Sequence, residues 1–109
     1  DIKTGRVEIA GYLQPLGRLD EAIALLEYGI VRDPVNPVGH LNLGQNYVLA
    51  GRLDDAIRSE RTALSLSPGI SGAQYWLGEA LLRKDEPEAA LAAFQAEEDD
   101  EWRVKGTAL

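Results

Sequence analysis

The heptad GRLDEAI, from Gly17 to Ile23, recurs almost unchanged thirty-four residues later as GRLDDAI, from Gly51 to Ile57. A near-identical match of this length within 109 residues indicates an internal repeat. A unit of this size cannot bury its apolar face alone, so neighbouring units must stack on one another. The repeat therefore predicts a linear array of stacked units.

The same residue types return three times when the chain is shifted against itself by thirty-four residues. The recurring pairs of an apolar and a small residue are Ile9-Ala10, Leu43-Gly44 and Leu77-Gly78. One helical turn later come Leu13, Tyr47 and Leu81, followed by the alanines Ala22, Ala56 and Ala90. Apolar residues at this spacing share one face of a helix. Each unit is therefore predicted to contain two amphipathic helices joined by a short turn.

The expected first helices span roughly residues 4–16, 37–50 and 71–84, and the second helices roughly 19–32, 53–67 and 86–98. Gly17 and Gly51 suit the left-handed stop after a helix, and Asn36 is a capping residue in front of Pro37. Asp85, with Glu88 three residues on, is predicted to form a capping pair.

Small residues are expected where the two helices of a unit cross. Close approach requires Gly or Ala at the contact, so Gly44 is predicted to face Ala56 and Gly78 to face Ala90. Glu60 departs from this pattern because it occupies a position directed toward the helix contact. Burying an unpaired carboxylate is costly, so Glu60 is expected at the edge of the contact or paired with an arginine such as Arg61 or Arg83.

This pattern resembles the tetratricopeptide repeat, a helix-turn-helix unit of 34 residues. The resemblance covers Lys3 to about Trp102 in three units, about 3–36, 37–70 and 71–102, without insertion. It implies an all-α fold, a right-handed α-α superhelix (solenoid) of three units plus the start of a further helix. Residues 103–109 are then a fourth repeat or a capping helix. Departures from the family pattern are Arg6, His40 and Gln74 in place of Trp, Gly29 and Glu97 in place of Ala, Glu60 in place of an aromatic residue, and Trp102 in place of the closing Pro.

Composition excludes several classes of protein. The net charge is −7 and the eleven basic residues are scattered, which argues against nucleic acid and anionic membranes as partners. No apolar run approaches the roughly 20 residues of a membrane span. There is no Cys, so disulfides, thiolate nucleophiles and cysteine zinc sites are excluded. We expect a cytoplasmic protein.

The inventory of reactive residues predicts no enzyme, no metal and no cofactor. His40 is the only histidine, and no nucleophile motif surrounds it. It is expected to be a half-buried packing residue, with ligand contact as the alternative. The acidic run from Glu97 to Glu101 lacks the alternation and turn Gly of a calcium loop. A solvated helix end is therefore expected there, with a cation site as the alternative.

The family resemblance implies that the first helices line a concave surface that binds peptides or partner helices. The predicted partner-binding residues are Leu41, Asn42, Gln45, Tyr75, Trp76, Glu79 and Arg83. Tyr75 and Trp76 are the expected anchor because aromatic residues dominate binding hot spots. The alternative is that Trp76 packs against the preceding unit. One subclass binds chaperone tails through a Lys, Asn and Arg clamp. Only Asn42 matches it, because Val7, Gly11, Gly72 and Trp76 hold the other places.

We therefore expect a protein-interaction scaffold without catalysis. The alternative is a homo-oligomer that forms through the C-terminal helix. Its contact would bury the apolar residues Trp102, Val104 and Leu109. An enzyme acting through His40 is a third hypothesis. The segment SGAQYWLGEALL and the residues after it resemble repeats near the C-terminus of bacterial multidomain signalling proteins, where they follow a nucleotide cyclase or winged-helix domain. We therefore expect the chain to be part of a longer protein.

Overall fold

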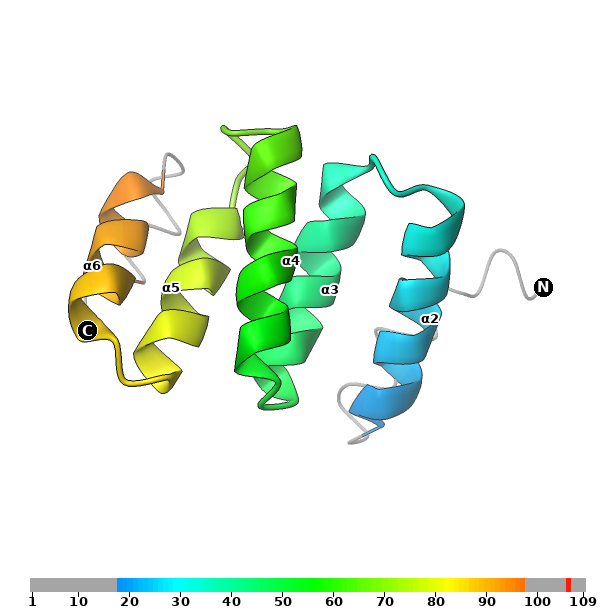
Figure 1. Cartoon of the computed structure of the whole chain (residues 1–109), viewed down its shortest axis with the longest axis horizontal. Helices are drawn as coiled ribbons and strands as arrows, with labels where there is room; N and C mark the ends of the chain where they lie inside the picture. The colour runs from blue at the N-terminus through cyan, green and yellow to red at the C-terminus, as the bar shows by residue number, and fades with distance from the viewer. Residues whose placement is uncertain (1–17, 98–105, 107–109) are drawn as a thin grey trace.

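The computed structural model describes residues 18–97 and residue 106 (Figure 1). Five helices follow one another across the molecule: α2 (Leu19–Arg32), α3 (Pro37–Leu49), α4 (Leu53–Leu66), α5 (Ala73–Arg83) and α6 (Pro87–Ala96). This part of the chain contains no strand, and none of its helices is long and apolar enough to cross a membrane. The all-α helical repeat solenoid is confirmed, and these five helices begin and end within two residues of the predicted positions. The helix expected over residues 4–16 lies outside the described residues.

The start and end of α3 follow directly from the sequence. The Asn36 side chain accepts a hydrogen bond of 3.0 Å from the backbone N–H of Val38, and Pro37 occupies the first helical position, as predicted. At the other end, Gly51 adopts a φ of 78°, in the left-handed region that Gly enters without strain. The N–H of Arg52 donates to the carbonyl of Tyr47 over 2.9 Å, which closes the helix end.

Asp85 ends α5 in the same way that Gly51 ends α3. Its φ is 64°, and the N–H of Glu86 donates to the carbonyl of Leu81 over 2.9 Å. The predicted capping pair of Asp85 and Glu88 is wrong, because the residue before α6 is Glu86, which makes no side-chain capping bond. Asp85 lies thirty-four residues after Gly51, so the stacking register rather than the local acidic spacing fixes its conformation.

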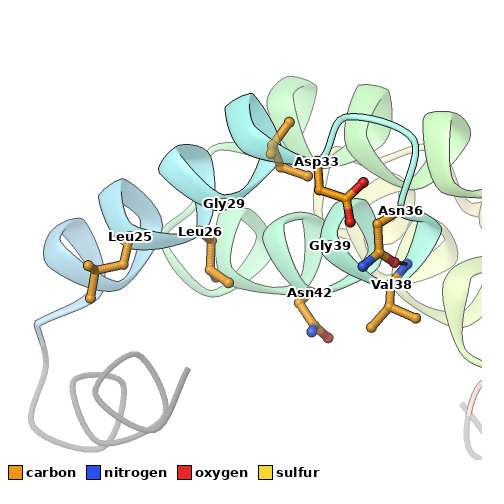
Figure 2. Close-up of a pocket in the computed structure, with 9 residues that line it drawn as sticks. Leu25, Leu26, Gly29, Asp33, Asn36, Val38, Gly39 and Asn42 are labelled. Atoms are coloured by element: carbon orange, nitrogen blue, oxygen red, sulfur yellow. Dashed lines mark hydrogen bonds between the residues drawn. The ribbon is translucent and has the colours of Figure 1, made fainter. Parts of the chain in front are cut away.

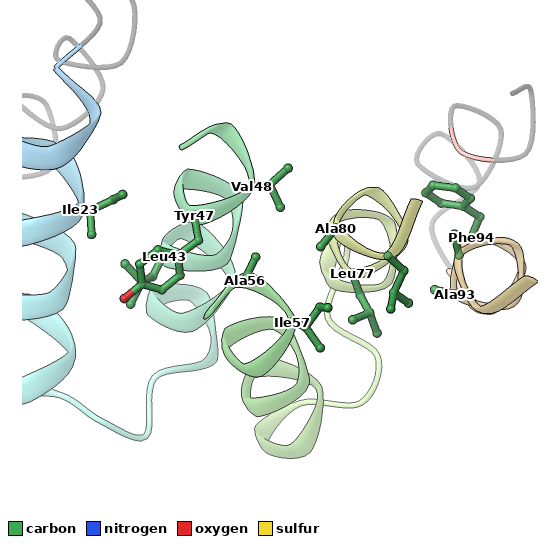
Figure 3. Packing of buried hydrophobic residues seen from close by; sticks show 12 residues of the cluster. Ile23, Leu43, Tyr47, Val48, Ala56, Ile57, Leu77, Ala80, Ala93 and Phe94 are labelled. Atoms are coloured by element: carbon green, nitrogen blue, oxygen red, sulfur yellow. The ribbon is translucent and has the colours of Figure 1, made fainter. Parts of the chain in front are cut away.

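The core runs along the row of helices. Each helix packs on its neighbour in the sequence, and α3 also contacts α5. Most of the buried apolar residues form one continuous cluster that reaches from Ile23 on α2 to Phe94 on α6 (Figure 3). Burial of such side chains is the main stabilising contribution, at about 25 cal/mol per Å² of apolar surface. Because contacts join only near neighbours, each pair of helices depends on the next.

Two glycines lie where the helices cross, but their predicted partners are wrong. A methyl group at Gly44 would overlap the carboxyl of Glu60, and one at Gly78 would overlap the ring of Phe94. The side chains opposite the glycines therefore lie one helical turn beyond Ala56 and Ala90. Gly106, the only described residue of the C-terminal segment, is also buried against Phe94.

Candidate functional site

The predicted binding residues lie on α3 and α5, two helices in contact with each other. We call this surface the α3–α5 face. Six of its residues are half-buried and Arg83 is exposed. Its members are Leu41, Asn42 and Gln45 on α3, and Tyr75, Trp76, Glu79 and Arg83 on α5. The structure thus places these residues on two helices that contact each other, and their common surface and role in binding stay a prediction.

Two aromatic side chains form the centre of the α5 part of this face. The rings of Tyr75 and Trp76 meet edge to face, with centroids 5.2 Å apart and an interplanar angle of 86°. Tyr75 also contacts the buried ring of Phe94, with centroids 5.8 Å apart. Both surface aromatics pack against the hydrophobic core. They are therefore rigid. Trp76 is half-buried, so part of its surface packs against the core and part stays accessible.

Burial also changes the acidity of the tyrosine. Loss of hydration raises the pKa of Tyr75 above its usual value, and the neighbouring negative charge of Glu79 adds to the effect. The phenol is therefore neutral at physiological pH. It offers a partner a neutral hydroxyl and an aromatic ring.

The charged residues of this face pair with one another. Arg83 Nη2 lies 3.6 Å from Glu79 Oε2, one turn away on α5. Arg83 Nη1 also donates to the backbone carbonyl of Val48 over 3.4 Å and so connects α5 to α3. An ion pair with this exposure stabilises the protein by less than about 1 kcal/mol, so a ligand can displace it. Val48 itself is fully buried, so its side chain does not line this surface.

The α3 part of the face carries free hydrogen-bonding groups. Within residues 18–97 the side-chain amides of Asn42 and Gln45 have no hydrogen-bond partner, and both residues are half-buried. By contrast, the nearby Asn46 is buried and its amide donates to the backbone carbonyl of Asn42 over 2.8 Å. A primary amide both donates and accepts, so Asn42 and Gln45 suit a peptide backbone.

The only histidine has a structural role in this arrangement. His40 is half-buried, as predicted, and its Nε2–H donates to the carbonyl of Pro34 over 2.8 Å. The ring thereby fixes the turn that joins α2 to α3. No group of three His, Asp or Glu side chains in the described part of the chain is placed to hold a metal ion.

Glu97 is not part of a solvated helix end, contrary to the prediction. It is 2% exposed, and its carboxylate accepts hydrogen bonds from the backbone N–H groups of Gly72, over 3.1 and 3.2 Å, and Tyr75, over 3.2 Å. These N–H groups belong to the start of α5, which has no capping side chain of its own. Glu97 therefore fixes the end of α5 from which the aromatic pair projects. Residues 98–101 of the acidic run lie outside the described residues.

Sequence analysis missed a groove between α2 and α3. It has a volume of about 400 Å³ and is mainly apolar (Figure 2). The lining residues are Leu25, Leu26, Gly29, Ile30, Asp33, Asn36, Val38, Gly39 and Asn42. Gly29 corresponds by register to Ala63, which is fully buried, whereas Gly29 is half-buried. The repeat register could have revealed this groove, because Gly29 stands at a position where the next unit has a larger residue, Ala63.

A tyrosine joins α2 to α3 beside this groove. The hydroxyl of Tyr47 donates to Glu27 on α2, and the guanidinium of Arg52 lies 4.6 Å from the centre of its ring. Burial, followed by the hydrogen bond to Glu27, raises the pKa of Tyr47 to about 12. This contact holds α2 against α3 and is structural.

Comparison with known protein families tests the family resemblance that the 34-residue repeat suggests. The pattern of the tetratricopeptide repeat matches residues 12–69 and 41–102, which together cover most of the chain. The chain belongs to the tetratricopeptide repeat family. Membership of this family supports a role as a protein-interaction scaffold, as in other tetratricopeptide repeat proteins.

Several solved structures are similar to this chain. Two crystal structures of MamA are 29% and 28% identical, with TM-scores of 0.72 and 0.74 over 92% and 96% of this chain. The chain spans about half of those proteins, 55% and 54%. The first TPR of Spaghetti (RPAP3), bound to the HSP90 peptide SRMEEVD, is 22% identical, with a TM-score of 0.76 over 94% of this chain and 77% of that chain. This last likeness shows the fold alone. The comparison with curated proteins found no match.

Proposed function

We propose that the α3–α5 face binds a peptide or helical segment of a protein partner, without catalysis. The observation that carries this proposal is the combination of a rigid aromatic pair, Tyr75 and Trp76, with amides on the neighbouring helix. These amides, of Asn42 and Gln45, have no hydrogen-bond partner within residues 18–97. Aromatic anchors supply binding energy, and amides supply hydrogen bonds to a peptide backbone.

The chemistry of the face favours an apolar or aromatic side chain as the partner's anchor. Arg83 and Glu79 neutralise each other, so the face has little net charge of its own. One similar structure is a TPR bound to an HSP90 peptide. In this chain only Asn42 occupies a matching place of the carboxylate clamp, while Val7, Gly11, Gly72 and Trp76 occupy the other places. We therefore propose an internal segment of the partner rather than a free C-terminus.

A peptide library displayed on phage tests this proposal. Peptides selected on the 109-residue chain are synthesised, and their dissociation constants are measured for wild type, Trp76→Ala and Asn42→Ala. We expect a loss of tenfold or more for Trp76→Ala and a smaller loss for Asn42→Ala. Leu91→Ala, at an exposed leucine of α6, is the control and should keep wild-type affinity. Equal affinities for wild type and Trp76→Ala, with folding confirmed by circular dichroism, would show that the α3–α5 face is not the binding surface.

Self-association through the C-terminal segment remains the second proposal. Trp102, Val104 and Leu109 lie outside the described residues, whereas Gly106 is buried against Phe94. Part of this segment therefore packs on α6. The origin of the chain in a bacterial multidomain signalling protein, and its place in the cytoplasm, also remain proposals.

A further inference from the structure

Glu60 is the one feature of the described chain that neither the fold nor the proposed function explains. It lies on α4 with 0% of its surface exposed, directly opposite Gly44 of α3. Neither carboxyl oxygen has a hydrogen-bond partner in the structure as described. The predictions that it lies at the edge of the contact or pairs with Arg61 or Arg83 are both wrong.

No charged group on the described helices compensates for this burial. The helices that pack on α4 are α3 and α5. The titratable or charged side chains of the three helices, Glu60 apart, are His40 and Tyr47 on α3, Asp54, Asp55, Arg58 and Arg61 on α4, and Tyr75, Glu79 and Arg83 on α5. None of them bonds to Glu60. His40 instead bonds to Pro34, Tyr47 bonds to Glu27, and Arg83 pairs with Glu79.

An isolated carboxylate in such a place is far less stable than the neutral acid. Burial alone raises the pKa of Glu60 from 4.5 to about 10. In the unfolded chain the same carboxyl is hydrated and ionises in the ordinary range. The folded and unfolded states therefore bind different numbers of protons at neutral pH.

We propose that Glu60 carries a proton in the folded protein and loses it when α3 and α4 separate, which makes the contact between these helices sensitive to pH. The direction follows from proton linkage. A group that binds its proton more tightly in the folded state stabilises the fold fully below the unfolded pKa, and this stabilisation is lost as the pH rises toward the folded pKa. The fold should therefore loosen between about pH 4.5 and about pH 10. Each pH unit in that window should raise the unfolding equilibrium constant about tenfold for this one proton.

The pH-sensitive contact at Glu60 would affect the proposed binding surface, but the inference holds whether or not that surface binds a partner. The α3 helix carries Leu41, Asn42 and Gln45 on one side and Gly44 at the contact with Glu60. Loss of the proton would free α3 from α4. The contact at Gly44 and the binding residues on α3 would then move together. The inference concerns folding, and its test requires no binding partner.

The first test measures urea unfolding of the 109-residue chain at several values between pH 5 and pH 9. We expect the unfolding constant of wild type to rise about tenfold per pH unit relative to that of Glu60→Gln, which cannot ionise. Glu88→Gln is the matched control, because the exposed Glu88 is hydrated in both states, and it should keep the wild-type dependence. Parallel pH profiles for wild type and Glu60→Gln would overturn the proposal.

A second measurement uses the wild-type protein and holds even where a variant fails to fold. The side-chain carboxyl carbon of Glu60 is followed by NMR through the same pH range. We expect the shift of a protonated carboxyl at pH 7, with no titration step near pH 4.5. An ionised carboxyl at pH 7 would refute the inference. Glu60→Leu, which places the residue of the equivalent position 26 here, should raise the midpoint of urea unfolding and remove the extra pH dependence.

Discussion

The helix pairs α3–α4 and α5–α6 share one architecture and differ in chemistry at two equivalent positions, the side chain opposite the crossing glycine and the residue of the turn. Gly44 lies against Glu60 in the first pair, and Gly78 lies against Phe94 in the second. The turn residue is Gly51 in one and Asp85 in the other, both with positive φ. This difference shows that the repeat register and the small residue at the crossing determine how closely the two helices of a pair approach each other. The large side chain opposite the glycine can be an acid or a phenyl ring.

The largest expected effect is a difference in stability between truncations at the two helix crossings. Phe94→Ala removes a buried ring that touches both Gly78 and Gly106, and should destabilise the fold by about 3–5 kcal/mol. Glu60→Ala also opens a cavity, but it removes a buried polar group without partners, so its net effect at pH 7 should stay within about 1 kcal/mol. Urea unfolding of both variants measures the contrast. Similar losses for the two would mean that Glu60 contributes packing energy comparable to that of Phe94.

The next effect concerns how α3 and α5 begin. Asn36 caps α3 locally, whereas Glu97 caps α5 from the far end of α6. Glu97→Gln removes the negative charge at a helix N-terminus and should cost about 1–2 kcal/mol. Hydrogen exchange should accelerate at the amides of Gly72 and Tyr75, which donate to this carboxylate.

Asn36→Ala is the matched comparison for this prediction. It should cost about 0.5–2 kcal/mol as well, but accelerate exchange at Val38 and leave Gly72 and Tyr75 protected. Unchanged exchange of Gly72 and Tyr75 in Glu97→Gln would show that the long-range cap does not hold α5.

Sequence reasoning recovered the features that depend on local patterns and missed those that depend on distant partners. The repeat period together with Asn36, Pro37 and Gly51 was enough to place the described helices. The environments of Glu60 and Glu97 were missed because their neighbours lie 16 or more residues away, at Gly44 and Gly72. A carboxylate in an amphipathic pattern looks the same whether it is hydrated, buried without a partner or capping another helix. The α3–α5 face could be assembled from register alone, but the burial of Val48 could not.

The smallest expected effect concerns the turn inside each helix pair. Here the repeat register of the sequence does indicate the backbone conformation. Asp85 occupies the register position of Gly51, and its φ of 64° is unfavourable for a residue with a side chain, although Asp tolerates it better than most. Asp85→Gly should therefore stabilise the protein by about 0.5–1 kcal/mol, after allowance for the greater flexibility of Gly in the unfolded chain. Gly51→Asp should have the opposite sign and a similar size, because it introduces the same strain into the α3–α4 turn. Urea unfolding of both single variants and of the double variant is the measurement. The Lys84–Asp54 ion pair links the two turns, so the double variant also measures how strongly they are coupled. A loss of stability in Asp85→Gly would mean that the Asp85 side chain stabilises its turn, and the equivalence of the two turns would then be one of backbone shape without equivalence of energy.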